Sequence, residues 1–369
     1  MQRIPVAQPT IGHREKELVE TCMTTGWISS VGKYVDEFES AFAKKLGVKH
    51  AISVSNGTLA LHLALMGMEL GPGDEVIVPA VTYVATANAV RYCGAEVRLA
   101  DVDPATMNVT PETVAAAITP RTKVIMPVHL FGIPCDMDGI MKLAAQHGLK
   151  VVEDSAEAVG ATWRDRSVGT LGDAGMFSFF GNKTITTGEG GMMVTNNDDI
   201  NARCRLLRGQ GMSPERRYWH TVVGYNYRMT NICAAIGLGQ LEQLDDKIAT
   251  RRRIRETYLS AFDAHGIADR LILPFGPAEA FDSVWMINIV LKSDVARTRD
   301  EITMTMDAMG IETRPTFYPL YEMPPYADLA GDFPGAQAAA RGITLPTYEA
   351  LEANQIDRVA QSLATAIER

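Results

Sequence analysis

One lysine of this sequence lies in a stretch that contains no other cationic side chain. Lys183 lies in the stretch 172–194, GDAGMFSFFGNKTITTGEGGMMV, among small, aromatic and hydroxyl residues. Burial disfavours the charged form of an amine and lowers its pKa, so a lone lysine in an apolar, tightly turned site can form a Schiff base with a carbonyl group. The alternative is a surface lysine on a glycine-rich loop, and this stretch alone does not decide between the two.

Acidic and aromatic residues stand at the ends of two strand-like runs upstream of this lysine. Asp154 closes the run KVVED, Glu157 follows it, and Tyr83 follows the run EVIVPAVT. A tyrosine ring at such a place offers a flat face to a planar ligand. Considered alone, Asp154 is better explained as a helix cap or a solvated acid.

The segment 51–68, AISVSNGTLALHLALMGM, is a candidate phosphate site. A short apolar strand ends in a polar turn, and a strongly helical run follows at once. Gly57 allows the tight turn, the free N–H groups of the first helical turn bind an anion, and Thr58 can add its hydroxyl. A simple N-cap explains the same residues. We expect His62 to be a packed helical residue and not a catalyst.

Strand-like and helical runs alternate from Asp74 to about Ile200. This alternation predicts a mostly parallel sheet covered on both faces, with ligand sites at the carboxyl ends of the strands. No G-x-G-x-x-G follows the first strand and no P-loop occurs, which disfavours nicotinamide and ATP sites. The predicted strands are EVIVPA, EVRLADV, KVIMPVHL, KVVEDSA and GMMVTN.

Length and composition limit the class of protein. With 369 residues the chain exceeds the usual size of one core, and we expect a large domain over 1–245 and a small one over 246–369. The net charge of −9 disfavours nucleic-acid binding. The absence of a long apolar stretch and of a signal-peptide core predicts a cytoplasmic protein without membrane contact. The five cysteines are odd in number, far apart and form no C-x-x-C pair, which favours reduced, mostly structural thiols over disulfides or zinc, and we expect no metal site.

These parts together are the ones that pyridoxal phosphate requires. This cofactor needs a lysine for its aldehyde, a carboxylate for its pyridinium nitrogen and fixed donors for its phosphate. Lys183, Asp154 and the helix start at Gly57 supply residues of these types.

The sequence resembles the DegT/DnrJ/EryC1/StrS family of sugar aminotransferases. The resemblance runs nearly end to end through TGWISSVGK, SNGTLALHLAL, DEVIVPAVTYVATANAV, PVHLFGIPCDMD, VVEDSAEAVGA, FSFFGNKTITTGEGGMMVTN, GYNYRMTNICAAIGLGQLE and IETRPTFYP. It implies a fold-type I, aspartate aminotransferase-like α/β fold, with a mostly parallel central sheet in a large domain and a smaller α/β C-terminal domain. It also implies pyridoxal phosphate as cofactor, with pyridoxamine phosphate as its intermediate form.

Several of these segments, among them WISSVGK, LLRGQGM and RRYWH, look most like the branch of the family that makes GDP-perosamine. Its members transfer the amino group of L-glutamate to C4 of GDP-4-keto-6-deoxy-D-mannose, which yields a precursor of surface polysaccharides. A related dehydratase carries histidine in place of the lysine, so Lys183 favours amino transfer. The alternative substrate is a dTDP- or UDP-linked 4-keto or 3-keto sugar.

The resemblance implies roles for individual residues. Lys183 is expected to bind the cofactor aldehyde and to move protons, and Asp154 to keep the ring nitrogen protonated. Tyr83 is expected to stack on the ring, and Glu157 to lie near the ring hydroxyl. The residues implied for the phosphate are Gly57, Thr58, Ser178 and, from the neighbouring subunit of a homodimer with shared active sites, Asn226.

The resemblance also implies contacts with the sugar nucleotide. Arg228 is a candidate for a carboxylate or pyrophosphate, with an inter-subunit ion pair as the alternative. Relatives usually read P-x-H in the segment after Arg314, and Tyr321 stands where the histidine is expected. A tyrosine can still donate a hydrogen bond. The implied substrate contacts are Trp27, Ser29, Arg228, Arg314, Tyr318 and Tyr321.

A long helix is predicted from Lys247 to about His265. It carries a run of arginines, for which a solvated face is the preferred explanation and a dimer surface or a phosphate contact the alternatives. The arginines are Arg251, Arg252, Arg253 and Arg255.

Overall fold

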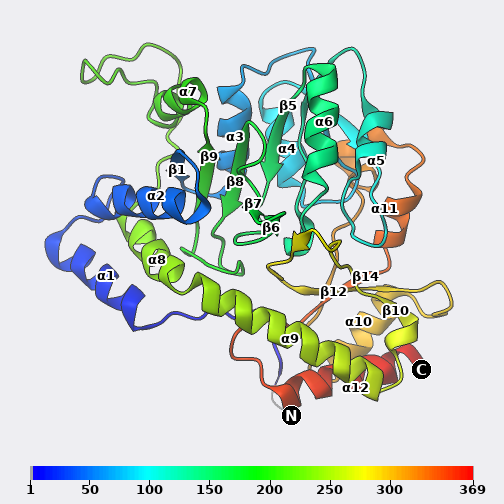
Figure 1. The fold of residues 1–369 in the computed structure, drawn as a ribbon. Coiled ribbons are helices and arrows are strands. Elements are labelled where there is room, and N and C mark those ends of the chain that lie inside the picture. Colours follow the sequence, from blue (N-terminus) through cyan, green and yellow to red (C-terminus); the bar gives the residue numbers. More distant parts are fainter. Residues whose placement is uncertain (1–2, 369) are drawn as a thin grey trace.

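The computed structural model describes residues 3–368, and its centre is a seven-stranded sheet in the order β1-β9-β8-β5-β4-β2-β3 (Figure 1). Among these seven strands only β9 runs antiparallel to its neighbours. Strand β2 is buried along its whole length, as is typical of a parallel sheet covered on both faces. The strands are β1 (His50–Val54), β2 (Glu75–Pro79), β3 (Glu96–Ala100), β4 (Thr122–Ile125), β5 (Lys150–Asp154), β8 (Ala174–Ser178) and β9 (Gly191–Thr195).

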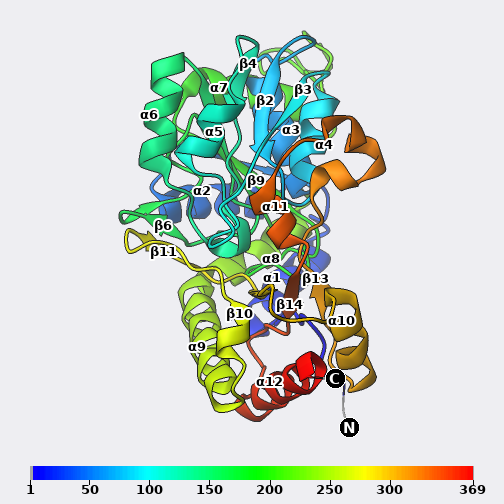
Figure 2. The ribbon, with the colours of Figure 1, turned by 90° about the vertical axis from the view of Figure 1, so that its right-hand side faces the viewer.

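Helices cover both faces of this sheet. In Figure 2, α5 and α6 lie on one side of the strands, and α3 and α4 lie on the other. Helix α3 is apolar nearly all round because it packs against the sheet, α4 and α7. The helices are α1 (His13–Thr25), α2 (Lys33–Leu46), α3 (Gly57–Gly67), α4 (Ala85–Tyr92), α5 (Pro111–Ala117), α6 (Met137–His147), α7 (Asp198–Arg208) and α8 (Asn231–Glu242).

A second sheet of four antiparallel strands, ordered β10-β12-β14-β13, forms the other end of the molecule (Figure 2). It has its own apolar core, built around Tyr258, Ile289 and Val359. Ile4 joins this core, and its backbone bridges Ile311. The elements are α9 (Leu244–Ala264), β10 (Leu271–Ile272), β12 (Ile287–Leu291), α10 (Arg299–Ala308), β13 (Arg314–Pro315), β14 (Gly342–Leu345) and α12 (Ala353–Glu368).

Short elements join the two ends. In a three-stranded sheet ordered β11-β6-β7, β6 pairs with both β11 and β7, so the segment just before β12 is joined to the chain between β5 and β8 of the large sheet. The remaining elements are β6 (Thr162–Trp163), β7 (Arg166–Ser167), β11 (Ala280–Phe281), α11 (Pro334–Ala339) and the 3₁₀ turns Leu130–Gly132, Ala268–Arg270, Leu320–Glu322 and Pro324–Leu329.

The arginine run of α9 differs from the prediction of a solvated face. Arg251 is buried, its Nε donates to Glu349 Oε1 at 3.0 Å, and its Nη1 donates to the carbonyl of Trp285. Arg255 Nη1 donates to Asp282 Oδ2 at 3.1 Å, whereas Arg253 is exposed. The helical period places Arg251 on the same inner face as the core residues of α9, so the prediction is wrong for this residue.

None of the helices within residues 3–368 combines the length and the apolar character that a membrane crossing needs. No group of three or more His, Cys, Asp or Glu side chains in this part of the chain is arranged to hold a metal ion.

Candidate active site

Lys183 lies in the tight connection between β8 and β9. The connection closes on itself, since Thr187 N donates to Phe179 O at 2.9 Å and Lys183 N donates to Phe180 O at 2.9 Å. The Lys183 side chain is only 12% exposed. Burial lowers the pKa of Lys183, and the carboxylates of Glu157 and Asp154 oppose this shift. Lys183 is therefore an enclosed amine and not a surface lysine.

Glu157 is the nearest acidic partner of this amine. Its Oε1 accepts from Lys183 Nζ at 3.4 Å, and its Oε2 accepts from the backbone N–H of Phe131 at 2.9 Å. Burial raises the pKa of Glu157, while the charge of Lys183 and the Phe131 N–H act in the opposite direction.

Asp154 ends β5, as predicted, but it is neither a helix cap nor solvated. It is buried, its Oδ2 accepts from Thr86 Oγ1 at 2.8 Å, and its Oδ1 accepts from Ala156 N at 3.1 Å. Burial raises the pKa of Asp154, opposed first by the Thr86 hydrogen bond and more weakly by the charge of Lys183. Thr86 escaped the sequence analysis, although it lies on the helix that follows Tyr83.

A second buried network holds the backbone of this strand end. Asp154 O accepts from His129 N at 3.0 Å, and His129 Nε2 lies 2.9 Å from Glu153 Oε2. Because Nδ1 of the same ring accepts from Cys135 N, the proton is on Nε2 and is donated to Glu153. Three backbone N–H groups, those of Gly169, Leu171 and Gly172, also donate to Glu153.

The start of α3 meets the end of β8. The helix begins at Gly57, and Asn56 caps it by accepting from Leu59 N at 3.0 Å, so the N-cap interpretation of this turn is confirmed. A Cβ at Gly57 would lie 2.9 Å from Ser178 Cβ and 3.2 Å from Ser178 Oγ. Backbone N–H groups, the Ser178 hydroxyl and the neighbouring Thr58 therefore gather where a bulkier residue than glycine cannot fit. Donor groups of these kinds can bind an anion.

Tyr83 presents its ring to solvent beyond β2, with 58% of its surface exposed. Its ring centre lies 5.7 Å from that of Phe317, which in turn stacks on Phe131. Backbone contacts bring the chain around Phe317 to this edge, because Leu320 N donates to Ala80 O at 2.8 Å.

The candidate substrate residues of the first helices and of the segment after α7 lie on the surface. Trp27 and Ser29 are exposed in the loop between α1 and α2, where Asn231 Nδ2 donates to Trp27 O at 2.7 Å. Asn226 and Arg228 are exposed as well, and the Arg228 side chain makes no hydrogen bond or ion pair within residues 3–368. The backbone of Arg228 bridges Val54, which places this segment beside the start of α3.

The candidates near β13 are held by local partners. Arg314 Nη2 lies 3.6 Å from Glu312 Oε1, and Arg299 stands over the Tyr318 ring at 4.7 Å. Tyr321 stacks on Phe333 with ring centres 5.2 Å apart, and its buried hydroxyl has no hydrogen-bond partner in the described part of the chain. None of the contacts of these three candidates within residues 3–368 joins them to Lys183.

Trp285 is the functional candidate that sequence reasoning missed. Lys183 Nζ lies 3.7 Å from the centre of its indole ring, and Trp285 Nε1 donates to Asn182 O at 2.9 Å. In the sequence it is one apolar residue of a strand-like run, and no local signal points to the lysine.

The residues present fit pyridoxal phosphate. An enclosed amine faces two buried carboxylates, and donors for an anion gather at Gly57. Two buried polar atoms of the residues that flank Lys183 in the sequence, Asn182 Oδ1 and Thr184 Oγ1, also lack a hydrogen-bond partner within residues 3–368.

Comparison with known proteins identifies the family. The family model of the DegT/DnrJ/EryC1/StrS aminotransferases matches residues 9–364. The chain belongs to this aminotransferase family. This aminotransferase is 53% identical over 365 residues to the GDP-perosamine synthase of Caulobacter vibrioides, with 98% of each chain covered. It is 45% identical over 364 residues to the GDP-perosamine synthase of Escherichia coli O157:H7, again with 98% of each covered.

A solved relative shows the same architecture. The putative sugar aminotransferase Spr1654 from Streptococcus pneumoniae superposes on this aminotransferase with a TM-score of 0.93, at 27% identity and with 99% of each chain covered. Its structures are described as a PLP-form, a PMP-form and an apo-form. The family and these structures confirm the predicted fold and the prediction of an aminotransferase that uses pyridoxal phosphate.

Proposed function

We propose that this aminotransferase moves the amino group of L-glutamate to C4 of GDP-4-keto-6-deoxy-D-mannose and so makes GDP-perosamine, a precursor of surface polysaccharide such as O-antigen. The reaction type is supported by the enclosed Lys183 amine, which lies 3.4 Å from a buried carboxylate. The observation that carries the substrate is the 53% identity to a GDP-perosamine synthase along nearly the whole of both chains.

In the proposed reaction the protein moves protons at defined atoms. Bound pyridoxal phosphate supplies an electron sink for the electron pair left when a proton leaves the carbon beside an amino group. Lys183 Nζ takes up that proton and returns it, for which the amine must be neutral, and burial favours the neutral form. Asp154 keeps a proton on the ring nitrogen of the cofactor, and Thr86 holds the Asp154 carboxylate in place.

Other residues of the proposed site bind and orient. Tyr83 would offer its ring face to the cofactor, and Glu157, which holds the Lys183 amine, would lie near the cofactor's ring hydroxyl. Gly57 and Thr58 at the start of α3 and Ser178 at the end of β8 would hold the phosphate. The proposed contacts with the sugar nucleotide are Trp27, Ser29, Arg228, Arg314, Tyr318 and Tyr321.

We propose a homodimer with shared sites, in which Asn226 of one subunit reaches the phosphate site of the other. Large apolar side chains are exposed on the loop between α1 and α2 and on the loop that follows α7, which projects from the molecule in Figure 1. Val223 alone is 93% exposed, and apolar exposure gathered in this way marks a contact surface. The exposed residues are Met23 near the end of α1, Trp27, Ile28 and Val31 in the loop that follows it, and Tyr218, Trp219, Val222 and Val223 after α7.

We further propose that the chain works as a cofactor-binding domain over 1–245 and a small domain over 246–369, in the cytoplasm. The separate apolar core around Tyr258 and Ile289 supports the division.

Tyr321 favours testing a second substrate class. This residue stands where the family usually has histidine, and its ring packs on Phe333. If the histidine contacts the sugar nucleotide in relatives, this contact differs here, and a dTDP- or UDP-linked keto sugar is the second candidate.

The decisive experiment charges the purified enzyme with L-glutamate and offers GDP-4-keto-6-deoxymannose and dTDP-4-keto-6-deoxyglucose in separate reactions. Amino-sugar product is detected by mass, and Lys183→Ala serves as the inactive control. Product from the GDP sugar alone supports the proposal. Product from the dTDP sugar, or from neither sugar, contradicts the proposed substrate and leaves the assignment to the family in place.

A further inference from the structure

Two different groups enclose the Lys183 amine. On one side Glu157 Oε1 lies 3.4 Å from Nζ, and on another the centre of the Trp285 ring lies 3.7 Å from Nζ. Trp285 is 7% exposed, so this cation–π contact is shielded from water. An ammonium over the face of a tryptophan ring is attracted by its quadrupole, and the attraction is stronger when the pair is desolvated.

The chain that carries Trp285 is tied to the chain that holds Glu157. Ser283 N donates to Gly132 O at 3.1 Å and Trp285 N donates to Phe131 O at 3.0 Å, while Phe131 N donates to Glu157. One short backbone ladder therefore places both neighbours of the amine.

This ladder contains two unusual backbone conformations. Phe131 has φ 60° and Val284 has φ 56°, both in the left-handed region. A β-branched residue such as valine rarely adopts this conformation, and strain of this kind persists where the surrounding structure enforces it and gathers at functional sites. Gly132 is needed at the crossing, because a Cβ there would lie 2.7 Å from Ser283 Oγ.

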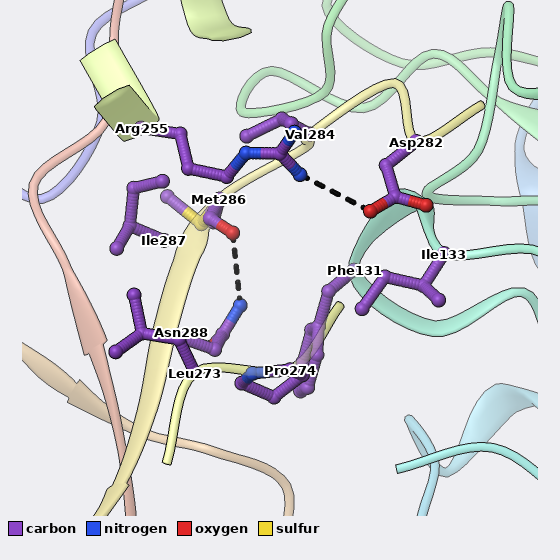
Figure 3. A pocket seen from close by; sticks show the side chains of 10 residues that line it. All are labelled: Phe131, Ile133, Arg255, Leu273, Pro274, Asp282, Val284, Met286, Ile287 and Asn288. Atoms are coloured by element: carbon purple, nitrogen blue, oxygen red, sulfur yellow. Dashed lines mark hydrogen bonds and ion pairs between the residues drawn. The ribbon is translucent and has the colours of Figure 1, made fainter. Parts of the chain in front are cut away.

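The far side of the same segment packs against α9. Val284 and Met286 line a cavity of about 20 Å³. Figure 3 shows them beside Phe131 and the ion pair of Arg255 with Asp282. Buried Arg251 donates to the carbonyl of Trp285 and is itself held by Glu349. The packing of α9 therefore sets where the indole ring stands.

We propose that Trp285 is a positioning residue for Lys183: its indole face holds the amine beside Glu157 and stabilises the ammonium form. Burial lowers the pKa of Lys183, whereas Glu157 and Asp154 raise it, and the indole face acts in the same direction as these two carboxylates. The ring thus limits how far burial lowers the pKa of the Lys183 amine. Because Lys183 serves the proposed amino transfer, this role rests on the proposed function, although it is measurable without any turnover.

The test titrates Lys183 in the cofactor-free full-length chain. Acetic anhydride is added in trace amounts across a pH series, and acylation of the peptide that contains Lys183 is quantified by mass spectrometry. In Trp285→Leu, which keeps an apolar side chain but lacks the ring face, the midpoint of acylation is expected to fall by about one pH unit. At a pH below the wild-type midpoint, Lys183 of this variant is then acylated several-fold faster.

Matched controls separate this effect from general damage. Phe281 lies on the same segment as Trp285, and Arg252 of α9 stands over its ring. Phe281→Leu removes this ring and is expected to leave the Lys183 midpoint unchanged. The exposed Lys150 is an internal reference in every sample, and circular dichroism reports the fold. Trp285→Phe keeps a ring with a weaker face and is expected to give a midpoint between those of the wild type and Trp285→Leu.

A Trp285→Leu midpoint equal to or above that of the wild type overturns the proposal. If Trp285→Leu does not fold, Trp285→Phe decides, and a Phe midpoint equal to or above the wild-type value overturns it. The acylation test contains neither cofactor nor sugar nucleotide. The proposed role of Trp285 and the proposed substrate can therefore be contradicted independently of each other.

Discussion

Lys183 and Glu157 form a buried ion pair, with Nζ 3.4 Å from Oε1 and side chains that are 12% and 4% exposed. Burial lowers the pKa of Lys183 and raises the pKa of Glu157, so it favours the neutral form of both groups. The charge of each partner acts against these shifts. A pair of this kind contributes little net stability, but its opposing effects on the pKa of the amine allow the amine both to hold and to release a proton.

Lys183→Ala is expected to keep the fold and to reduce turnover by more than about 10⁴-fold, since it removes both the covalent attachment point and the group that moves the proton. The absorbance of the lysine-bound cofactor is expected to disappear. Turnover is measured as glutamate-dependent formation of amino sugar, with Lys150→Ala, an exposed ion-pair residue, as control. An active Lys183→Ala enzyme contradicts the assignment.

Asp154→Asn is expected to retain most cofactor binding and to lower kcat by about 10²-fold or more, because the amide keeps the shape of the side chain but cannot carry the charge that holds the ring proton. The hydroxyl of Thr86 can turn to accept from the new amide. Cofactor affinity and kcat are measured separately. Unchanged kcat removes Asp154 from its proposed role.

Glu157→Gln is expected to change how stability depends on pH in the cofactor-free chain. The pKa of Glu157 in the folded protein is raised above its usual value of 4.5. The contribution of Glu157 to the free energy of unfolding is therefore complete below pH 4.5 and is lost as the pH rises through the raised pKa. The free energy of unfolding of the wild type should therefore fall relative to Glu157→Gln between about pH 4.5 and pH 8. Urea denaturation at the two pH values gives the difference, and parallel curves would falsify the raised pKa.

Mixing inactive Lys183→Ala and Asn226→Ala subunits is expected to restore activity if the sites are shared. Each mixed dimer then has one site with both residues intact, so equal amounts that mix at random give about one quarter of the wild-type activity. Subunit exchange is verified by mass spectrometry of the intact dimers. Mixed dimers without activity favour a role of Asn226 within its own subunit.

Tyr321→Phe is expected to raise the free energy of unfolding by up to about 1 kcal/mol, because the buried hydroxyl has no partner within residues 3–368 and its removal leaves the stacking on Phe333 in place. Amino transfer to the preferred sugar nucleotide should persist in this variant. A loss of kcat/KM greater than about tenfold would show that the hydroxyl, and not the ring alone, makes the proposed contact of Tyr321 with the substrate.

Much of the framework could be predicted from local patterns. The alternation of apolar runs and helices determined the mostly parallel sheet, since each strand buried on both faces must be nearly all apolar. The turn before Gly57 was recognisable because helix starts need short polar caps. Lys183 was visible because its loop holds no other cation, and the family resemblance then assigned it a chemistry.

Only the tertiary structure decided which groups surround that lysine. Trp285 lies 103 positions from Asn182, to which its indole donates, and Thr86 lies 68 positions from Asp154. The burial of Arg251 likewise depends on Glu349 and on the carbonyl of Trp285, none of which is a neighbour in sequence. A periodic pattern shows which face of an element turns inward, but the partner on that face is set by how distant elements pack, and the pKa of a buried group depends on that partner.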